Sequence, residues 1–135
     1  MYNLDMVKIS ERSRYPVEPK PSAYVISFAP ELIPAILSGE KVMTYRYNGA
    51  GKYEYLNVGD KVNIQNSKSD EIVAPGVVTD KERTMFLDLP LDRPGHEPYG
   101  NKEEQRAVFS GYYAYLGRPI KDEDPFLILG YKLDN

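Results

Sequence analysis

The stretch "SGEKVMTYRY", residues 38–47, joins a predicted helix to a predicted strand. Glycine at position 39 is typical of the residue that ends a helix, because it adopts the left-handed conformation without strain. The alternation of residues that follows is typical of a strand, in which successive side chains point to opposite faces. The stretch therefore predicts a helix–strand junction.

Two polar side chains of this strand are predicted to face a cleft or solvent. One face carries Val42, Thr44 and Arg46, and the other, the predicted core face, carries Met43, Tyr45 and Tyr47. Lys41 lies three residues before Thr44, so an ideal strand would place the two on opposite faces. They can meet only if Lys41 belongs to the turn after the helix and its side chain curls back. The alternatives are a small polar pocket and an ordinary edge strand with solvated Lys41 and Arg46.

The elements before and after the junction indicate one α+β domain. We expect a strand over residues 23–28 and a short helix over 30–38, followed after the junction strand by a Gly59-Asp60 turn and a strand over 61–66. Residues 71–80 resemble a strand that is bulged or bent at Pro75-Gly76, and residues 83–89 resemble another strand. Asn101 and Gly117 delimit a predicted helix over 102–116. The final apolar run, 126–133, predicts a central strand. Together these elements predict a small, mostly antiparallel β-barrel with two helices.

Composition excludes several classes of function. The 135 residues fit one domain, and the net charge of −3 argues against strong binding to long duplex nucleic acid. The absence of cysteine excludes thiolate sites, and a single histidine leaves no obvious metal site, so no metal or cofactor is expected. No signal peptide or membrane span is apparent, which predicts a cytoplasmic protein without a membrane partner. Residues 1–21 are predicted to form an irregular arm, and 22–135 to form the domain.

Other conspicuous residues have structural interpretations at this stage. His96 is interpreted as an incidental histidine of the Pro- and Gly-rich loop over residues 90–100. Glu103 and Glu104 are interpreted as charges at the N-terminus of the predicted helix. Three tyrosines are interpreted as core and rim of that helix: Tyr112, Tyr113 and Tyr115.

Across residues 22–134 the chain resembles the ASCH domain, a member of the PUA-like superfamily. The family's junction pattern is approximately Gly-x-Lys-Thr-x-Thr-x-Arg, which Gly39, Lys41, Thr44 and Arg46 match, while Val42 stands where a threonine is usual. The "VGDKV" turn and the last strand "FLILGYKL" follow in the family's order. The resemblance implies a PUA-like β-barrel with a cleft beside the junction, and a role in recognising RNA or a modified nucleoside.

The resemblance also implies candidate site residues. Small bacterial ASCH proteins hydrolyse N4-acetylcytidine-type amides with a lysine and a threonine of the junction and a glutamate before the later helix. These roles fall on Lys41, Thr44 and Glu97, with Glu103 as the substitute for the glutamate. Lys41, Thr44 and Arg46 are the implied residues for binding RNA or a nucleoside.

Three hypotheses follow. A binding module for RNA or a modified nucleoside ranks first and needs no activated nucleophile. An amidohydrolase ranks second and needs Lys41, Thr44 and Glu97 to converge, with Lys41 able to lose its proton. A protein-interaction or regulatory domain, in which the junction is merely structural, is the third.

Overall fold

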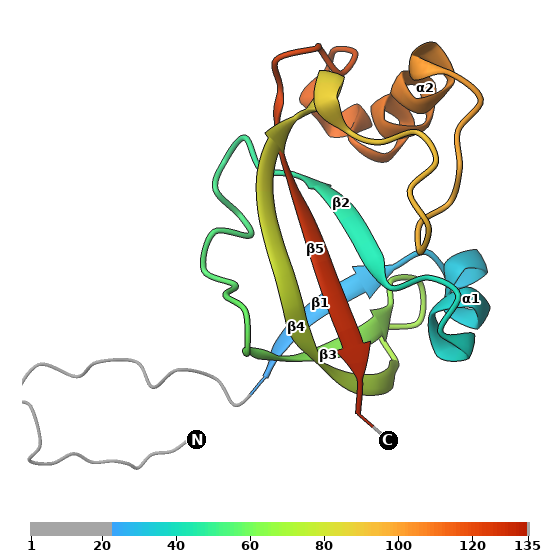
Figure 1. Cartoon of the computed structure of the whole chain (residues 1–135), viewed down its shortest axis with the longest axis vertical. Helices are drawn as coiled ribbons and strands as arrows, with labels where there is room; N and C mark the ends of the chain where they lie inside the picture. Colours follow the sequence, from blue (N-terminus) through green and yellow to red (C-terminus); the bar gives the residue numbers. More distant parts are fainter. Residues whose placement is uncertain (1–22, 135) are drawn as a thin grey trace, which may run out of the picture.

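The computed structural model describes residues 23–134, which contain five strands in one curled sheet (Figure 1). The order across the sheet is β1-β3-β4-β5-β2. The strands are β1 (Tyr24–Phe28), β2 (Met43–Tyr47), β3 (Lys61–Asn66), β4 (Ile72–Met85) and β5 (Pro125–Leu133). β1 pairs with β3 in parallel, and the other neighbouring pairs are antiparallel. The predicted α+β, mostly antiparallel barrel is therefore confirmed as a half-barrel. The predicted arm over 1–21 lies outside the described residues.

Two short helices accompany the sheet, and a left-handed glycine ends the first helix and the 3-10 turn that follows the second. A 3-10 turn (Pro30–Leu32) leads into α1 (Ile33–Ser38), which ends at Gly39 with φ of 85°. α2 (Lys102–Tyr112) begins after Asn101, whose side chain accepts a hydrogen bond from the backbone of Glu104 as a helix cap does. A further 3-10 turn (Ala114–Leu116) ends at Gly117 with φ of 73°. Both predicted helices are thus present, each partly as 3-10 turn.

β4 differs from the prediction. One strand of 14 residues replaces the two predicted over 71–80 and 83–89, and residues 86–88 form a 3-10 turn. Pairing continues through Pro75 and Gly76, and the register shifts fall instead around Val73 and Thr79. Pro75 is tolerated because its carbonyl faces the side where β5 ends at Leu133, and it accepts there from the backbone of Asp134. The missing N–H of the proline therefore breaks no bond of the ladder.

β5 is the central strand, as its apolar sequence predicts. It lies between β4 and β2, and its two faces belong to two hydrophobic clusters. Leu127, Leu129 and Tyr131 face the concave cluster inside the half-barrel, whereas Phe126 and Ile128 face a second cluster. The second cluster also contains Phe109 of α2 and Tyr45 of β2, and the other two residues of the predicted core face of β2, Met43 and Tyr47, pack at its margin.

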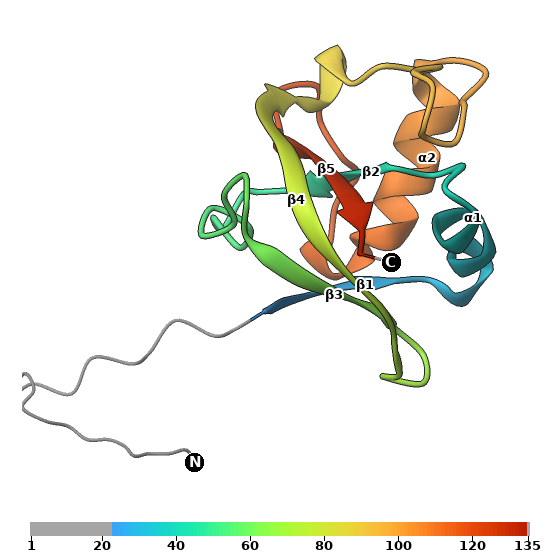
Figure 2. The same ribbon diagram turned by 60° about the horizontal axis from the view of Figure 1, so that its bottom comes forward.

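The opposite face of β2 turns toward the inside of the half-barrel. Thr44 pairs with Leu129 and Arg46 pairs with Leu127, so both polar residues share the face of the concave cluster. Figures 1 and 2 show that β1 runs toward α1 and that β2 leads away from it, with α1 and α2 on the same side of the sheet. The candidate site lies at this open side.

Candidate functional site

The turn after α1 places Lys41 as the sequence argument required. Gly39 ends the helix, and the backbone N–H of Lys41 donates to the carbonyl of Ala35 at 2.9 Å. Lys41 therefore precedes β2, and its ammonium group curls back to donate to the carbonyl of Met43 at 2.9 Å. The residue is only 3% exposed. A lysine from the turn thus reaches the same side as the polar face of β2.

A backbone contact brings the loop over residues 90–100 to this junction. The N–H of Val42 donates to the carbonyl of Gly95 at 2.9 Å. Gly95 has φ of 93°, and a Cβ there would lie 2.6 Å from a methyl of Val42, so only glycine fits this close approach. The next two residues of the loop, His96 and Glu97, are thereby held against β2.

Glu97 and Lys41 form an ion pair, with 2.7 Å between Oε2 and Nζ. Burial lowers the pKa of Lys41, and the hydrogen bond and charge of Glu97 act in the opposite direction. Arg46 adds a smaller effect that also lowers the pKa of Lys41. Burial is the larger cause, so Lys41 loses its proton more easily than a lysine in water.

Arg46 is held by three hydrogen bonds and one ring contact, most of which tie β2 to its neighbours across the open side. Its Nε donates to Thr44 Oγ1 at 2.8 Å, and its Nη2 donates to the carbonyl of Ser27 in β1 at 2.8 Å. Its Nη1 donates to the Tyr53 hydroxyl at 3.3 Å, and its guanidinium lies 4.7 Å from the centre of the Phe28 ring. A side chain fixed in this way presents its remaining donors in a set direction.

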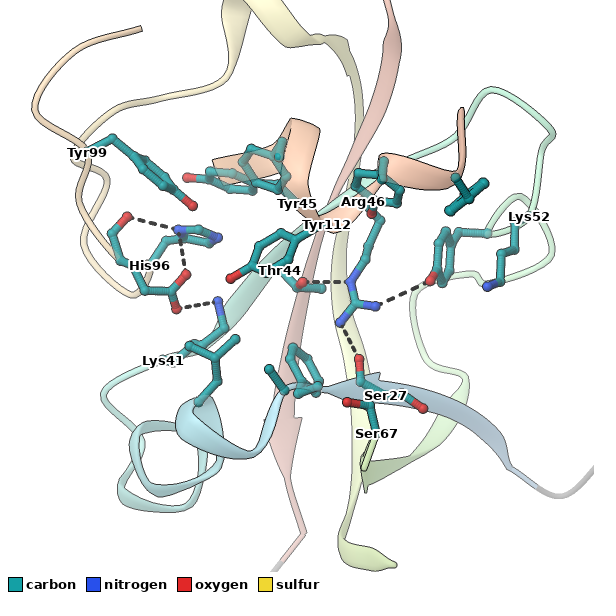
Figure 3. Close-up of a pocket in the computed structure, with 18 residues that line it drawn as sticks. Ser27, Lys41, Thr44, Tyr45, Arg46, Lys52, Ser67, His96, Tyr99 and Tyr112 are labelled. Carbon is teal, nitrogen blue, oxygen red and sulfur yellow. Dashed lines mark hydrogen bonds and ion pairs between the residues drawn. The ribbon is translucent and has the colours of Figure 1, made fainter. Parts of the chain in front are cut away.

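Lys41, Thr44, Arg46 and Glu97 line one cavity of about 320 Å³ (Figure 3). Its other walls are largely aromatic and come from β1, β2, the segment between β2 and β3, the loop over 90–100, and α2 with the 3-10 turn after it. These aromatic residues are Phe28, Tyr45, Tyr53, His96, Tyr99, Phe109, Tyr112, Tyr113 and Tyr115. The structure thus brings together the four residues that the family resemblance implies for the site.

Two residues singled out in the sequence lie elsewhere. Glu103, the substitute for Glu97, is 80% exposed and pairs with Arg106 on the surface of α2. Val42, predicted to share one strand face with Thr44 and Arg46, instead precedes β2 and packs on Gly95. It lines a different cavity, of about 280 Å³, beside β4 and β5. The face assignment is therefore wrong for Val42, because ideal alternation begins only at Met43.

The main cavity offers several hydrogen-bond donors without a protein acceptor among the described residues. Lys41 uses two of its three N–H groups, on Met43 and Glu97, and Arg46 uses three of its five. Thr44 Oγ1 accepts from Arg46, so its own proton is directed elsewhere. The free donors favour a ligand that carries carbonyl or ring-nitrogen acceptors.

Sequence reasoning missed His96, which lines the cavity and whose side chain is 3% exposed. Its ring stacks on Tyr45, with 3.7 Å between ring centres and 4° between planes. Tyr112 and Tyr115, interpreted as core and rim of a helix, lie at the edge of the cavity and are 54% and 74% exposed. The adjacency of His96 to Glu97 was the available signal.

Two further observations concern residues 23–134 alone. They contain no group of three or more His, Asp or Glu side chains placed to hold a metal ion. None of their helices has the length and apolar character needed to cross a membrane.

Comparison with known proteins identifies the fold. No family model and no curated protein matches the chain. Among solved structures, it is similar to protein EF3133 of Enterococcus faecalis V583, from the family DUF984, with a TM-score of 0.63 and 16% identity over 82% of this chain and 76% of that one. An ASCH domain from Lactobacillus crispatus JV V101 matches with a TM-score of 0.59 and 19% identity, covering 82% and 79%.

The ASCH protein of Zymomonas mobilis matches with a TM-score of 0.53 and 17% identity, covering 80% of this chain and 65% of that one. Identities this low establish similarity of architecture. They agree with the resemblance carried by the junction motif, the turn that follows it and the last strand. This chain has the ASCH, PUA-like fold.

Proposed function

We propose that the protein binds a nucleoside, either free or as an unpaired nucleotide of RNA, in the cavity between β1, β2 and α2. The observation that carries the proposal is the lining of this one cavity of about 320 Å³, where fixed donors of Lys41, Thr44 and Arg46 face aromatic rings. Pockets for small ligands are typically about 300–1,000 Å³ and combine apolar walls with a few placed polar groups.

The donor set fits the acceptors of a pyrimidine. A cytosine ring carries a carbonyl oxygen and a ring nitrogen side by side, and both accept hydrogen bonds. The guanidinium of Arg46 offers two free N–H groups, and Lys41 and Thr44 add one each. A buried site built to hydrogen-bond a ligand rejects compounds that leave its groups unpaired.

The aromatic rim supports a ligand presented as a single strand. Tyr112 and Tyr115 are exposed at the cavity edge, and exposed rings stack on unpaired bases of any sequence. The net charge of −3 provides no extended basic surface for a duplex. We therefore expect preference for nucleosides and short single strands over duplexes.

Titration with a short cytidine-containing RNA and with a DNA duplex tests this proposal. We expect the RNA to bind more tightly at physiological salt, and Arg46→Ala to weaken its binding at least tenfold. Arg83→Ala is the matched control, because Arg83 is 67% exposed and pairs with Glu54 outside the cavity. Tighter binding to the duplex, or equal losses for the two arginine variants, would contradict the proposal.

A second candidate function is hydrolysis of an N4-acylated cytidine. The observation that favours it is the buried Lys41, whose pKa burial lowers, in the same cavity as Thr44. In this reaction Thr44 Oγ attacks the amide carbonyl carbon while Lys41 takes the hydroxyl proton. The C–N bond then breaks, the proton passes from Lys41 to the leaving N4, and water releases the acyl group from Thr44. Glu97 holds the ammonium form between these steps.

Release of acetate from N4-acetylcytidine, followed without added metal, tests the second candidate. We expect turnover to rise with pH as Lys41 loses its proton, and Thr44→Ala to remove most of it. Thr44→Ser keeps the hydroxyl and should retain some turnover, whereas Lys41→Arg should have none, since guanidinium stays protonated near neutral pH. Absence of turnover by the wild type between pH 6 and 9 would remove hydrolysis and leave binding.

A further inference from the structure

His96 has one ring nitrogen engaged by protein and one open to the cavity. Nδ1 lies 3.0 Å from the carbonyl oxygen of Glu97 and 3.4 Å from its Oε1. A carbonyl and an ionised carboxylate can only accept, so Nδ1 must carry the proton of the neutral ring. Nε2 makes no hydrogen bond among residues 23–134, and Figure 3 shows it on the side of the ring that is turned toward Thr44 and Tyr112.

The surroundings of His96 keep the ring neutral. Tyr45 stacks on one of its faces, and Tyr99 lies 5.9 Å from its centre. The charged groups that face it are Lys41, Arg46 and Glu97. Burial and the ammonium of Lys41 lower the pKa of His96 to about 4, against the weaker opposing effect of Glu97. Near neutral pH, Nε2 is therefore a bare lone pair, which accepts and cannot donate.

We propose that His96 determines ligand specificity by accepting a hydrogen bond at Nε2 from an N–H group of the bound base. The proposal rests on the proposed nucleoside binding and makes it more specific. The donors of Lys41, Thr44 and Arg46 select a base for its acceptors, and Nε2 adds the requirement for an N–H beside them. Cytidine, with its N4 amino group, satisfies both requirements, and N4,N4-dimethylcytidine satisfies only the first.

His96 is the only histidine of the chain, so its ring can be observed without assignment. A two-bond 1H–15N correlation spectrum of the 15N-labelled full chain reports which ring nitrogen carries the proton. We expect the Nδ1–H form between pH 6 and 8, and a shift of the Nε2 signal when cytidine is added. An Nε2–H or doubly protonated ring in this range would overturn the proposal.

Affinities for the two nucleosides complete the test. We expect the wild type to bind cytidine about 10- to 100-fold more tightly than N4,N4-dimethylcytidine, as the loss of one hydrogen bond to a buried acceptor implies. His96→Phe keeps a ring against Tyr45 but lacks Nε2, so it should bind both nucleosides equally. Discrimination that persists in His96→Phe would be steric and would overturn the proposal.

The outcomes separate this proposal from the one on which it rests. Binding of both nucleosides with equal affinity by the wild type overturns the role of His96 and leaves nucleoside binding intact. Binding of neither overturns both. If His96→Phe fails to fold, as judged by its thermal transition, the wild-type tautomer and the response of Nε2 to the two nucleosides still decide the matter.

Discussion

Lys41 is buried and Lys102 is half-buried, and their ammonium groups have different hydrogen-bond partners. Lys102 donates to the carbonyls of Phe86 and Leu89, both at 3.0 Å, and to Gln105 Oε1 at 2.6 Å. Its three N–H groups are thus all used, and every acceptor is neutral. Lys41 donates to one carbonyl and one carboxylate, and its third N–H has no acceptor among the described residues.

The comparison separates a structural lysine from a candidate functional one. Lys102 ties the segment after β4 to the first turn of α2, and the amide nitrogen of the fully buried Gln105 completes the tie by donating to the carbonyl of Pro90. Lys41 instead lines the cavity and pairs with a carboxylate that also contacts His96. A buried lysine with a saturated set of neutral acceptors stabilises the fold, whereas one with a free donor is available to a ligand.

The largest effect on stability is expected from Lys102→Met. The substitution leaves three acceptors without their donor, at about 1 kcal/mol or more each when the acceptor is buried. We therefore expect the free energy of unfolding in urea to fall by about 3 kcal/mol. Lys41→Met, measured in parallel, should cost less than half as much. It removes the penalty of burying an ammonium, and the carboxylate of Glu97 that it leaves unpaired is 36% exposed and can be hydrated. Equal losses in the free energy of unfolding for the two variants would contradict the distinction between a structural Lys102 and a functional Lys41.

The second largest effect on stability is expected from acidification, because His96 lies beside Lys41 and resists protonation in the folded chain. The unfolded chain binds a proton on His96 below pH 6.5, but the folded chain binds it only near pH 4, so stability falls as the pH falls through this window. At about 1.4 kcal/mol per unit, the loss is about 2 to 3 kcal/mol. Urea unfolding at pH 7 and pH 4 should show a smaller loss for His96→Phe than for the wild type.

The lysine variants sharpen the acid experiment. Removing the charge of Lys41 raises the pKa of His96 toward its ordinary value, so Lys41→Met should lose less stability on acidification than the wild type. Lys102→Met should lose as much as the wild type, since Lys102 is absent from the charges that act on His96. The reverse order of the two variants would contradict the assigned surroundings of the ring.

Raising the pH above neutral should increase the stability of the folded chain, by less than acidification decreases it. Burial lowers the pKa of both lysines in the folded chain, so the unfolded chain holds the proton to higher pH and stability rises as the pH rises toward 10.5. The range pH 7–9.5 avoids Tyr45, Tyr99 and Tyr131, whose pKa values burial raises. The free energy of unfolding should increase less with pH in Lys41→Met than in Lys102→Met, because Lys41 is the more buried of the two lysines.

The smallest effect is expected from Val42→Thr, which introduces the threonine of the junction pattern that this chain resembles. Because Val42 packs on Gly95 outside the main cavity, the substitution should change nucleoside affinity less than about twofold and unfolding by less than about 0.5 kcal/mol, as for ordinary surface changes. Calorimetric titration checks this value. A tenfold gain in nucleoside affinity would contradict this expectation and show that the side chain at position 42 affects binding.

Much of the fold was predictable because its signals are local. Gly39 and Gly117 end helices by their left-handed conformation, and Asn101 caps the helix that it precedes. The apolar run of β5 indicates burial on both faces. In contrast, the continuity of β4 through Pro75 depends on where β5 ends, which is a property of the assembled sheet.

The site was predictable in part for the same reason. The geometric condition on Lys41, that it curl back from the turn, follows from strand alternation and is met. The burial of His96 was not predictable, because it depends on the bond between Val42 and Gly95, more than 50 residues apart in the chain. The difference between Lys41 and Lys102 was equally hidden, since the acceptors of Lys102 include carbonyls 13 and 16 residues away.

Calorimetric titration of cytidine and N4-acetylcytidine into three proteins tests the central claim most directly. The wild type and Lys102→Met, the latter at a temperature where it remains folded, should bind with the same affinity. Lys41→Met should bind at least tenfold more weakly, although it is the more stable of the two variants. Absence of nucleoside binding by the wild type, or undiminished binding by Lys41→Met, would contradict the assignment of this cavity as a nucleoside site.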